Sequence, residues 1–397
     1  MSRSGLLEDA PVVVYVQQML EQAVLLRASD LHFEPYEKLY RVRMRIDGQL
    51  RECCPAPAEF RERLAARIKV MARLDVAEKR LPQDGRMKLQ LQTGRELDLR
   101  ISTLPTLYGE KVVVRVLDAR QDQLNLATLG YEPQDLAQLQ QAIHRPHGMV
   151  LVTGPTGSGK TQSLYACLNQ LNTPEVNIAT VEDPCEIQLN GINQVNVQDK
   201  PGLSFAVALR AFLRQDPDIL MVGEIRDLET AHIAIQAAQT GHLVLSTLHT
   251  NDAPATLVRL RNMGVASYNI AASVSLVTAQ RLVRRLCQLC REPGRLSAEA
   301  LRAAGHAAPL DADGYGIFSP RGCSACHKGF AGRTGIFQVM PVSTTMQELI
   351  VQEASALDLE RQARQEGMQG LRQAGLRKVL GGETSLDEVL AATRDQP

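Results

Sequence analysis

The chain has 397 residues, 44 basic and 44 acidic side chains, eight cysteines and 4% aromatic residues. This length exceeds one ordinary domain and predicts two or three units with buried cores. The balanced charge argues against a nucleic-acid-binding surface that depends on overall positive charge. No apolar run approaches the roughly 18 residues of a membrane-spanning helix, and no secretory signal pattern opens the chain. We therefore expect a soluble cytosolic protein with reduced thiols.

The first part of the chain predicts a small α+β domain. Apolar residues recur at helical spacing over residues 10–28, which indicates an amphipathic helix. Residues 40–46 alternate strictly before an Asp47-Gly48 turn, so a strand should place Arg41, Arg43 and Arg45 on one face. We interpret that arginine row first as a solvated sheet face. The other predicted elements are a helix over 58–74, strands over 86–91 and 95–101 joined at Thr93-Gly94, and a strand over 111–117.

Residues 149–161 indicate an apolar strand, a glycine-rich loop and the start of a helix. The loop fits the G-x-x-x-x-G-K-[ST] pattern, in which backbone N–H groups and a helix N-terminus surround phosphates. Lys160 would reach the β- and γ-phosphates, and the Thr161 hydroxyl would hold Mg²⁺. We expect a nucleoside triphosphate such as ATP as the ligand, although a chance glycine-rich turn is the alternative. The predicted binding residues are Gly154, Pro155, Thr156, Gly157, Ser158, Gly159, Lys160, Thr161 and Gln162.

Acidic residues follow two further predicted strands. The strand over 176–181 ends in Glu182 and Asp183, and the strand over 219–222 is followed by Glu224. In an open α/β sheet, carboxyl ends of strands face the ligand crevice. We therefore predict that Glu182 orients or deprotonates the attacking water, and that Glu224 acts through the metal. Each acid also has a purely structural alternative, a turn cap for Glu182 and an ion pair with Arg226 for Glu224.

Two histidines bracket a fourth predicted strand over 243–247. They are His242 and His249, and a histidine beside an apolar strand is often a structural residue. A site role and a structural role are left equally open for both.

Eight cysteines include two C-x-x-C pairs, Cys287 with Cys290 and Cys323 with Cys326. Together they predict a tetrahedral Cys₄ zinc site, which would be structural because four thiolates leave no open position. The intervening segment includes a predicted helix over 298–304, and four unrelated thiols are the alternative. Cysteines without ligand spacing are interpreted as ordinary thiols, namely Cys53, Cys54, Cys167 and Cys185.

The end of the chain, beyond Gly335, predicts amphipathic helices that pack on a core. Their apolar stripes are formed by Met346, Leu349, Ile350, Leu357 and Leu359.

Several motifs occur in one order along the chain and resemble those of the secretion ATPases that drive type II secretion and type IV pilus assembly. Two further stretches, 103–111 and 191–196, are more similar to the pilus extension ATPases than to the type II secretion ones. The resembling motifs are Ala28 to Pro35, Leu81 to Arg86, Gly154 to Thr161, Val181 to Pro184, Leu213 to Asp218 with Gly223 to Asp227, and Thr240 to Thr250.

The resemblance implies a homohexameric motor with nucleotides between subunits. It places an aspartate box on Glu182, Asp183 and Glu186, the Walker B acid on Glu224, and a histidine box on His242 and His249. It also implies that N-terminal-domain arginines reach the phosphates, with Arg86, Arg100 and Arg115 as the matching candidates. Many pilus and type II secretion ATPases carry a tetracysteine element, which agrees with the zinc site predicted here.

The resemblance further implies cytoplasmic location at the inner membrane, reached through a platform protein of a pilus or secretion complex. The neutral net charge and the few aromatic residues count against a nucleic-acid partner. Longer members carry an additional N-terminal domain, whose docking and cyclic-dinucleotide functions are not transferred to this chain. We expect a pilus extension motor. The alternatives are a type II secretion motor, a nucleic-acid translocase and a scaffold that binds ATP without turnover.

These observations predict an α/β protein. Its parts are a RecA-like P-loop NTPase domain, a smaller N-terminal α+β (PAS-like) domain, and a C-terminal helical, zinc-binding region. The predicted boundaries are 1–118 for the N-terminal domain, 119–133 for a linker, 134–285 for the ATPase core, 286–330 for the tetracysteine element and 331–397 for the helical region.

Overall fold

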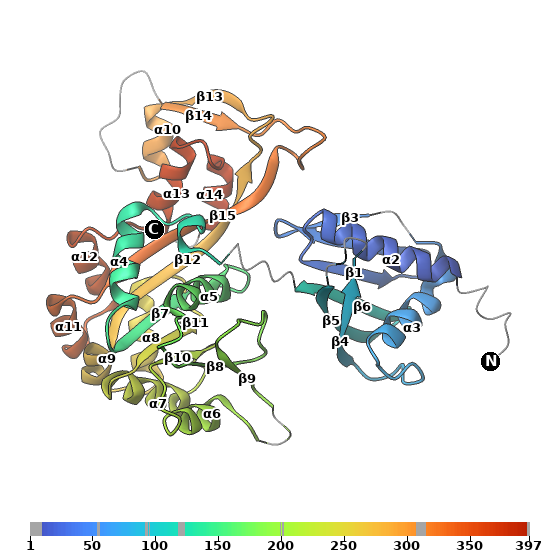
Figure 1. The fold of residues 1–397 in the computed structure, drawn as a ribbon. Helices are drawn as coiled ribbons and strands as arrows, with labels where there is room; N and C mark the ends of the chain where they lie inside the picture. The colour runs from blue at the N-terminus through green and yellow to red at the C-terminus, as the bar shows by residue number, and fades with distance from the viewer. Residues whose placement is uncertain are drawn as a thin grey trace. The chain divides into compact units, whose positions relative to one another are not determined.

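The computed structural model describes residues 10–53, 56–91, 94, 96–117, 124–198, 200, 202–306 and 315–394. The chain divides into two compact units, Met1–Ala119 and Arg120–Pro397 (Figure 1). Features predicted at Cys54, Thr93, Arg95 and within 118–123 lie outside the described residues. Among the residues described, no helix is long and apolar enough to cross a bilayer.

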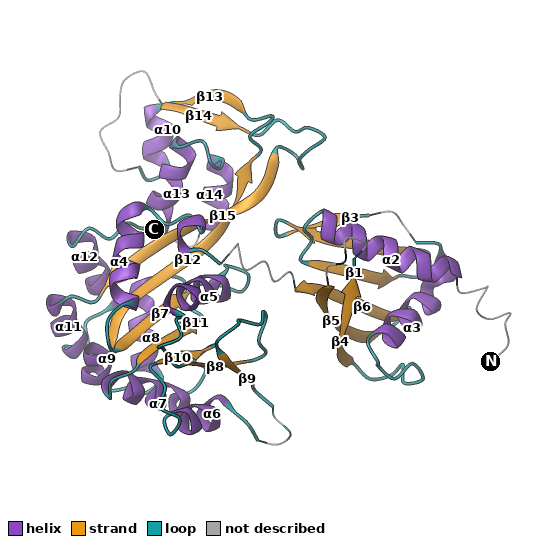
Figure 2. Cartoon of the chain, in the orientation of Figure 1, coloured by secondary structure: helices purple, strands orange, loops and turns teal. Residues whose placement is uncertain are grey.

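The N-terminal unit is an antiparallel sheet with helices packed on one face (Figure 2). Its strand order is β3-β2-β1-β6-β5-β4, and apolar residues of both helices join one core with the inward side chains of the strands. The elements are α2 (Ala10–Leu25), β1 (Asp30–Pro35), β2 (Tyr40–Ile46), β3 (Gln49–Glu52), η1 (Ala58–Phe60), α3 (Arg61–Met71), β4 (Gln83–Gln90), β5 (Glu96–Thr106) and β6 (Gly109–Leu117).

The arginine row of β2 is more than a solvated face. The predicted alternation is confirmed, because inward residues of β2 are buried and the arginines point to the other face. Arg41 Nε lies 3.2 Å and Arg43 Nε 2.8 Å from Glu34 Oε2 on β1, while Arg45 Nε is 3.7 Å from Asp30. The row is therefore tied to two acids of the neighbouring strand.

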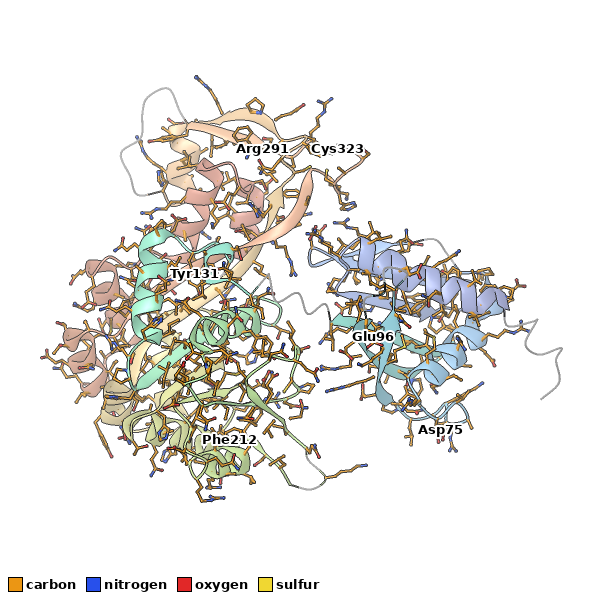
Figure 3. The ribbon with its side chains drawn as sticks, in the orientation of Figure 1. Asp75, Glu96, Tyr131, Phe212, Arg291 and Cys323 are labelled. Atoms are coloured by element: carbon orange, nitrogen blue, oxygen red, sulfur yellow. The ribbon has the colours of Figure 1, made fainter. Side chains whose placement is uncertain are left out.

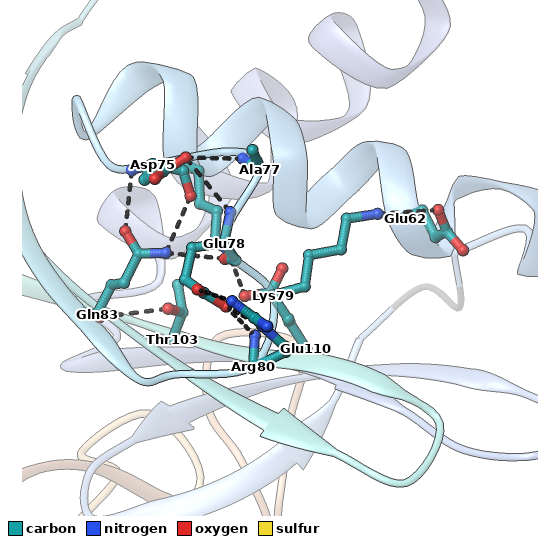
Figure 4. A network of polar contacts seen from close by, with 10 residues as sticks. Glu62, Asp75, Ala77, Glu78, Lys79, Arg80, Gln83, Thr103 and Glu110 are labelled. Carbon is teal, nitrogen blue, oxygen red and sulfur yellow. Dashed lines mark hydrogen bonds and ion pairs between the residues drawn. The ribbon is translucent and has the colours of Figure 1, made fainter.

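A polar network orders the loop between α3 and β4 (Figure 4). Gln83 accepts a hydrogen bond from Asp75 N and returns one to Asp75 O, both 2.9 Å. The buried Lys69 ammonium donates to Glu78 O at 2.7 Å. The helix predicted to reach residue 74 ends at Met71, because Arg73 adopts a left-handed conformation with φ +57°.

The second unit is built on a mixed sheet, whose order within the described residues is β15-β12-β7-β11-β10-β8-β9. Adjacent strands are parallel except for β15, which pairs antiparallel with β12. Alternate residues of β7 enter opposite cores: Met149 and Leu151 face one, and Val150 and Val152 the other. Both faces are therefore covered, as the α/β fold class requires.

Most sheet strands of this unit are separated by helices along the sequence, although β9 follows β8 without a helix between them. The elements up to β12 are η3 (Leu126–Thr128), α4 (Pro133–Ile143), β7 (Gly148–Thr153), α5 (Lys160–Leu171), β8 (Ile178–Glu182), β9 (Asn193–Asn196), α6 (Phe205–Phe212), β10 (Ile219–Val222), α7 (Leu228–Gln239), β11 (Leu243–Leu248), α8 (Ala253–Asn262), α9 (Ser267–Ser273) and β12 (Val274–Leu286). The C-terminal elements are β13 (Glu292–Leu296), α10 (Ala298–Ala303), β14 (Tyr315–Ser319), β15 (Phe330–Pro341), α11 (Thr344–Val351), α12 (Ala356–Gln365), α13 (Leu371–Leu380) and α14 (Leu386–Ala392).

The structure differs from the predicted organisation in three places. Residues 124–133 of the expected linker pack on the second unit, where Tyr131 stacks on Phe337 with ring centroids 3.5 Å apart (Figure 3). The region predicted as helical from residue 331 begins with β15, which extends the central sheet. Leu357, which the sequence predicts on an apolar stripe that packs on the core, is 56% exposed, whereas Leu359 on the same helix is buried.

Candidate functional site

The glycine-rich loop has the strand–loop–helix setting that its motif requires. It joins the C-terminal end of β7 to α5, and Gly159 caps the helix in a left-handed conformation with φ +90°. Gly154 has φ +148°, and a Cβ there would lie 2.6 Å from both Gln280 O and Ser158 Oγ. Only glycine therefore fits this close approach without displacement.

Lys160 begins α5 and folds over the loop. Its ammonium donates to Gly154 O at 2.9 Å. Burial lowers the pKa of Lys160; the charge of Arg281 acts in the same direction, and the carboxylate of Glu224 opposes both. The acid that follows β10 thus acts electrostatically on the lysine of the phosphate loop.

Glu224 lies in a cluster at the carboxyl edge of the sheet. His249, which follows β11, places Nε2 3.1 Å from Glu224 Oε2. Arg226 pairs with Glu224 and lies 3.7 Å from Asp183. Burial alone raises the pKa of Glu224, but hydrogen bonding and charge from Arg226, with help from His249, hold that pKa below its usual value. The ion pair considered as the structural alternative is therefore present, together with a histidine contact.

Glu182 ends the neighbouring strand β8 in different surroundings. Its side chain is buried, and its carboxylate accepts hydrogen bonds from Tyr165, from Thr180 at 2.6 Å and from Gln194 at 3.2 Å. The residue carries neither an arginine nor a lysine among these partners. Both carboxylate oxygens therefore accept hydrogen bonds from the protein interior, and the water-activating role of Glu182 stays a prediction.

The two histidines occupy opposite ends of β11. His249 is at the carboxyl end with Glu224, whereas His242 precedes the strand and its Nδ1 lies 3.0 Å from Ala237 O. The carboxyl end of β7, which carries the phosphate loop, pairs with the carboxyl end of parallel β11. The structure therefore does not bring His242 to the phosphate loop of the same chain.

The three candidate arginines of the N-terminal unit form a cross-strand row. Arg86 on β4 pairs in register with Arg100 on β5, and Arg100 pairs with Arg115 on β6. The row continues to Asp30, whose Oδ1 lies 3.0 Å from Arg115 Nε. The fold thus gathers these arginines on one sheet face, as a set able to meet a polyanion.

The four predicted zinc ligands also come together. All four Sγ atoms lie within 4.8 Å of one another, with Cys287 and Cys323 3.9 Å apart and Cys290 and Cys326 3.6 Å apart. Tetrahedral thiolates at about 2.3 Å from zinc would be roughly 3.8 Å apart. The sulfur positions therefore fit zinc, at the end of the antiparallel β13–β14 pair where Glu292 is in register with Ser319 and where Figure 3 labels Cys323.

Sequence reasoning did not single out residues that contact the loop from β12. Gln280 and Arg281 follow Ala279, which is in register with Thr153 at the end of β7. Gln280 Nε2 donates to Ser158 O at 2.7 Å. The signal available in the sequence was a mainly apolar stretch, Val274 to Ala279, followed by the polar Gln280 and Arg281.

Comparisons with known proteins agree with this geometry. A family model described as "Type II/IV secretion system protein" matches residues 6–391. The type IV pilus assembly ATPase PilB of Acinetobacter baylyi is 54% identical over 389 residues, which are 98% of this chain and 67% of the relative. The protein of the same name from Pseudomonas aeruginosa is 52% identical, over 98% of this chain and 68% of its own length. Type II secretion system protein E of Pseudomonas aeruginosa is 49% identical over 98% of this chain and 77% of its own length.

Solved structures share the fold. The Legionella pneumophila ATPase DotB has a TM-score of 0.71 at 20% identity, with 96% of each chain covered. The pilus retraction motor PilT with bound ADP has a TM-score of 0.65 at 24% identity, covering 96% of this chain and 97% of that one.

The fold and the loop define a P-loop α/β nucleotide-binding protein. The extent of the family match and the identity to its relatives make the assignment specific: the chain belongs to the Type II/IV secretion system protein family.

Proposed function

We propose that this chain is an ATP-hydrolysing motor subunit for type IV pilus assembly. The observation that carries the proposal is the 54% and 52% identity, across 98% of the chain, to proteins named type IV pilus assembly ATPases. A type II secretion motor is the second candidate, because a protein named for that system is 49% identical over the same share of the chain.

The phosphate loop would bind the triphosphate through Gly154 to Thr161, with Gln162 beside it. Thr161 lies in the first turn of α5, so its hydroxyl would hold Mg²⁺, which supplies positive charge to the phosphate oxygens. Lys160 adds a second positive charge. We assign Glu224, which His249 contacts, as the acid that acts on the water. Asp183 is assigned as a second acid of the site, because Arg226 pairs with both Glu224 and Asp183.

The arginine row of the N-terminal unit would contribute the remaining positive charge. Arg86, Arg100 and Arg115 share one face, and an arginine that reaches a transferring phosphoryl group is worth about 10³ to 10⁵ in turnover. In a homohexamer with nucleotides between subunits, the row and the phosphate loop would belong to the same composite site. Native mass measurement with and without ATP and Mg²⁺ tests this arrangement; a persistent monomer with full activity would remove it.

The four cysteines would hold a structural zinc ion that closes the β13–β14 excursion onto the domain. Removal of zinc by a chelator should lower the Tm by several degrees without changing the KM for ATP. The Cys323→Ser variant should behave in the same way, and Cys185→Ser, outside the cluster, is the control. Equal zinc content in Cys323→Ser and the parent chain would exclude the assignment.

The motor would act in the cytoplasm and reach the inner membrane through a platform protein of the pilus complex. Deleting the gene and scoring surface pili against secreted enzymes separates the two candidates: loss of pili supports pilus assembly, and intact pili with lost secretion supports the second function. Turnover that rises many-fold with single-stranded DNA would instead favour a translocase. Equal phosphate release from the parent chain and Lys160→Ala would favour a scaffold without turnover.

A further inference from the structure

A buried amide lies against the phosphate loop from a strand distant in sequence. Gln280 lies in the middle of β12, one residue beyond Ala279, which pairs with the last residue of β7, and it is 2% exposed. Its Nε2 donates to Ser158 O at 2.7 Å, and its Oε1 accepts from Ser163 Oγ at 2.8 Å. One side chain therefore bonds both the loop backbone and the first turns of α5.

The same residue also shapes the two glycine positions that flank the loop. A Cβ at Gly154 would lie 2.6 Å from Gln280 O, and a Cβ at Gly159 would lie 3.2 Å from Gln280 Nε2. Gln280 therefore lies directly against the loop at its first glycine and at its last. The hydrogen bond to the Ser158 carbonyl restrains rotation of its peptide plane. The N–H that follows belongs to the same plane, so its direction is held as well.

We propose that Gln280 is a positioning residue that holds the phosphate loop in its nucleotide-binding conformation. It touches neither substrate nor metal in this assignment; it acts through Ser158 and α5. The inference rests on nucleotide binding by the loop. Because the loop contacts phosphates in the ground state and in the transition state alike, loss of its order should weaken binding more than it slows chemistry.

The chain offers a matched control on the adjacent strand. Gln338 of β15 is in register with Ala279, is 3% exposed, and accepts a hydrogen bond from Ala253 N at 2.9 Å. Gln338→Met therefore removes a buried amide of the same type that contacts α8 rather than the loop. Both replacements keep the approximate length of the side chain.

The experiment measures the KM for ATP, kcat, the Kd of a fluorescent ATP analogue and Tm for the full chain. Gln280→Met should raise KM and Kd about tenfold, because it removes the hydrogen bonds of the amide to the Ser158 carbonyl and the Ser163 hydroxyl, while kcat changes less than threefold. Ser163→Ala, which frees only the Oε1 side of the amide, should give a smaller rise in the same direction. Gln338→Met should lower Tm with KM and Kd unchanged.

Three outcomes overturn the inference: an unchanged KM and Kd in Gln280→Met, an equal rise in Gln338→Met, or a fall in kcat alone. If Gln280→Met does not fold, the Kd of Ser163→Ala decides, because that change is confined to one hydroxyl. Failure of the proposed function would be distinct, since the parent chain itself would then not bind the analogue, or Lys160→Ala would bind it equally well.

Discussion

Two acids at the ends of neighbouring strands occupy contrasting surroundings. Glu224 after β10 contacts His249 and Arg226 and influences the phosphate-loop lysine. Glu182 at the end of β8 is enclosed by the hydroxyls of Tyr165 and Thr180. Both positions follow from the same strand-end rule. The comparison teaches that a strand end brings a carboxylate to the edge of the sheet, whereas its neighbours decide whether it remains available for chemistry.

The largest expected effect is on turnover in Glu224→Gln. Removal of a general base or of the charge that positions water and metal should lower kcat by about 10² to 10⁴. Phosphate release at saturating ATP measures it, with Glu229→Gln as a control, because that exposed acid lies on the nearby α7 and pairs with Arg210 of α6. A kcat within threefold of the parent would remove Glu224 from the chemistry.

The second effect separates structure from chemistry at Glu182. Glu182→Gln replaces an acceptor with an amide among donors, so the free energy of unfolding should fall by about 1–3 kcal/mol. Its kcat should fall less than that of Glu224→Gln. Thermal unfolding beside phosphate release checks both statements, and Glu175→Gln, exposed before the same strand, is the control. A kcat loss equal to that of Glu224→Gln with unchanged Tm would support the water-orienting role predicted from the sequence.

Sequence reasoning located the phosphate loop and the strands beside it because strand periodicity and the glycine pattern are local features. The surroundings of Glu182 could not be predicted in that way, since Tyr165 and Gln194 reach it from α5 and β9. The sequence alone leaves the same two roles open for His242 and His249, whereas the direction of β11 places them at opposite edges of the sheet. The strand β12 was not predicted from the sequence, because basic residues interrupt its apolar pattern after Ala279.

A third buried acid sharpens the comparison by its response to pH. Glu34 on β1 is enclosed like Glu182, yet its partners are cations: Arg43 at 2.8 Å and Lys111 at 3.1 Å. Burial raises its pKa, but the hydrogen bonds and charges of Arg43 and Lys111 outweigh burial and lower the pKa from 4.5 to about 2. A carboxyl with a depressed folded-state pKa stabilises the protein above its unfolded pKa, and this stability is lost as pH falls toward the folded value.

The third effect is measured from the dependence of stability on pH. Between about pH 4.5 and pH 2 the parent chain should lose on the order of 3 kcal/mol of stability through Glu34. Glu34→Gln should start less stable at pH 7 and show a correspondingly flatter decline, measured as urea midpoints of the full chain at successive pH values. Glu62→Gln is the control, because its exposed pair with Lys79 should contribute little. If the stabilities of Glu34→Gln and the parent fell equally steeply as the pH is lowered, the cations around Glu34 would not keep its carboxylate charged. Enclosure by neutral donors and enclosure by cations would then have the same consequence for a buried acid.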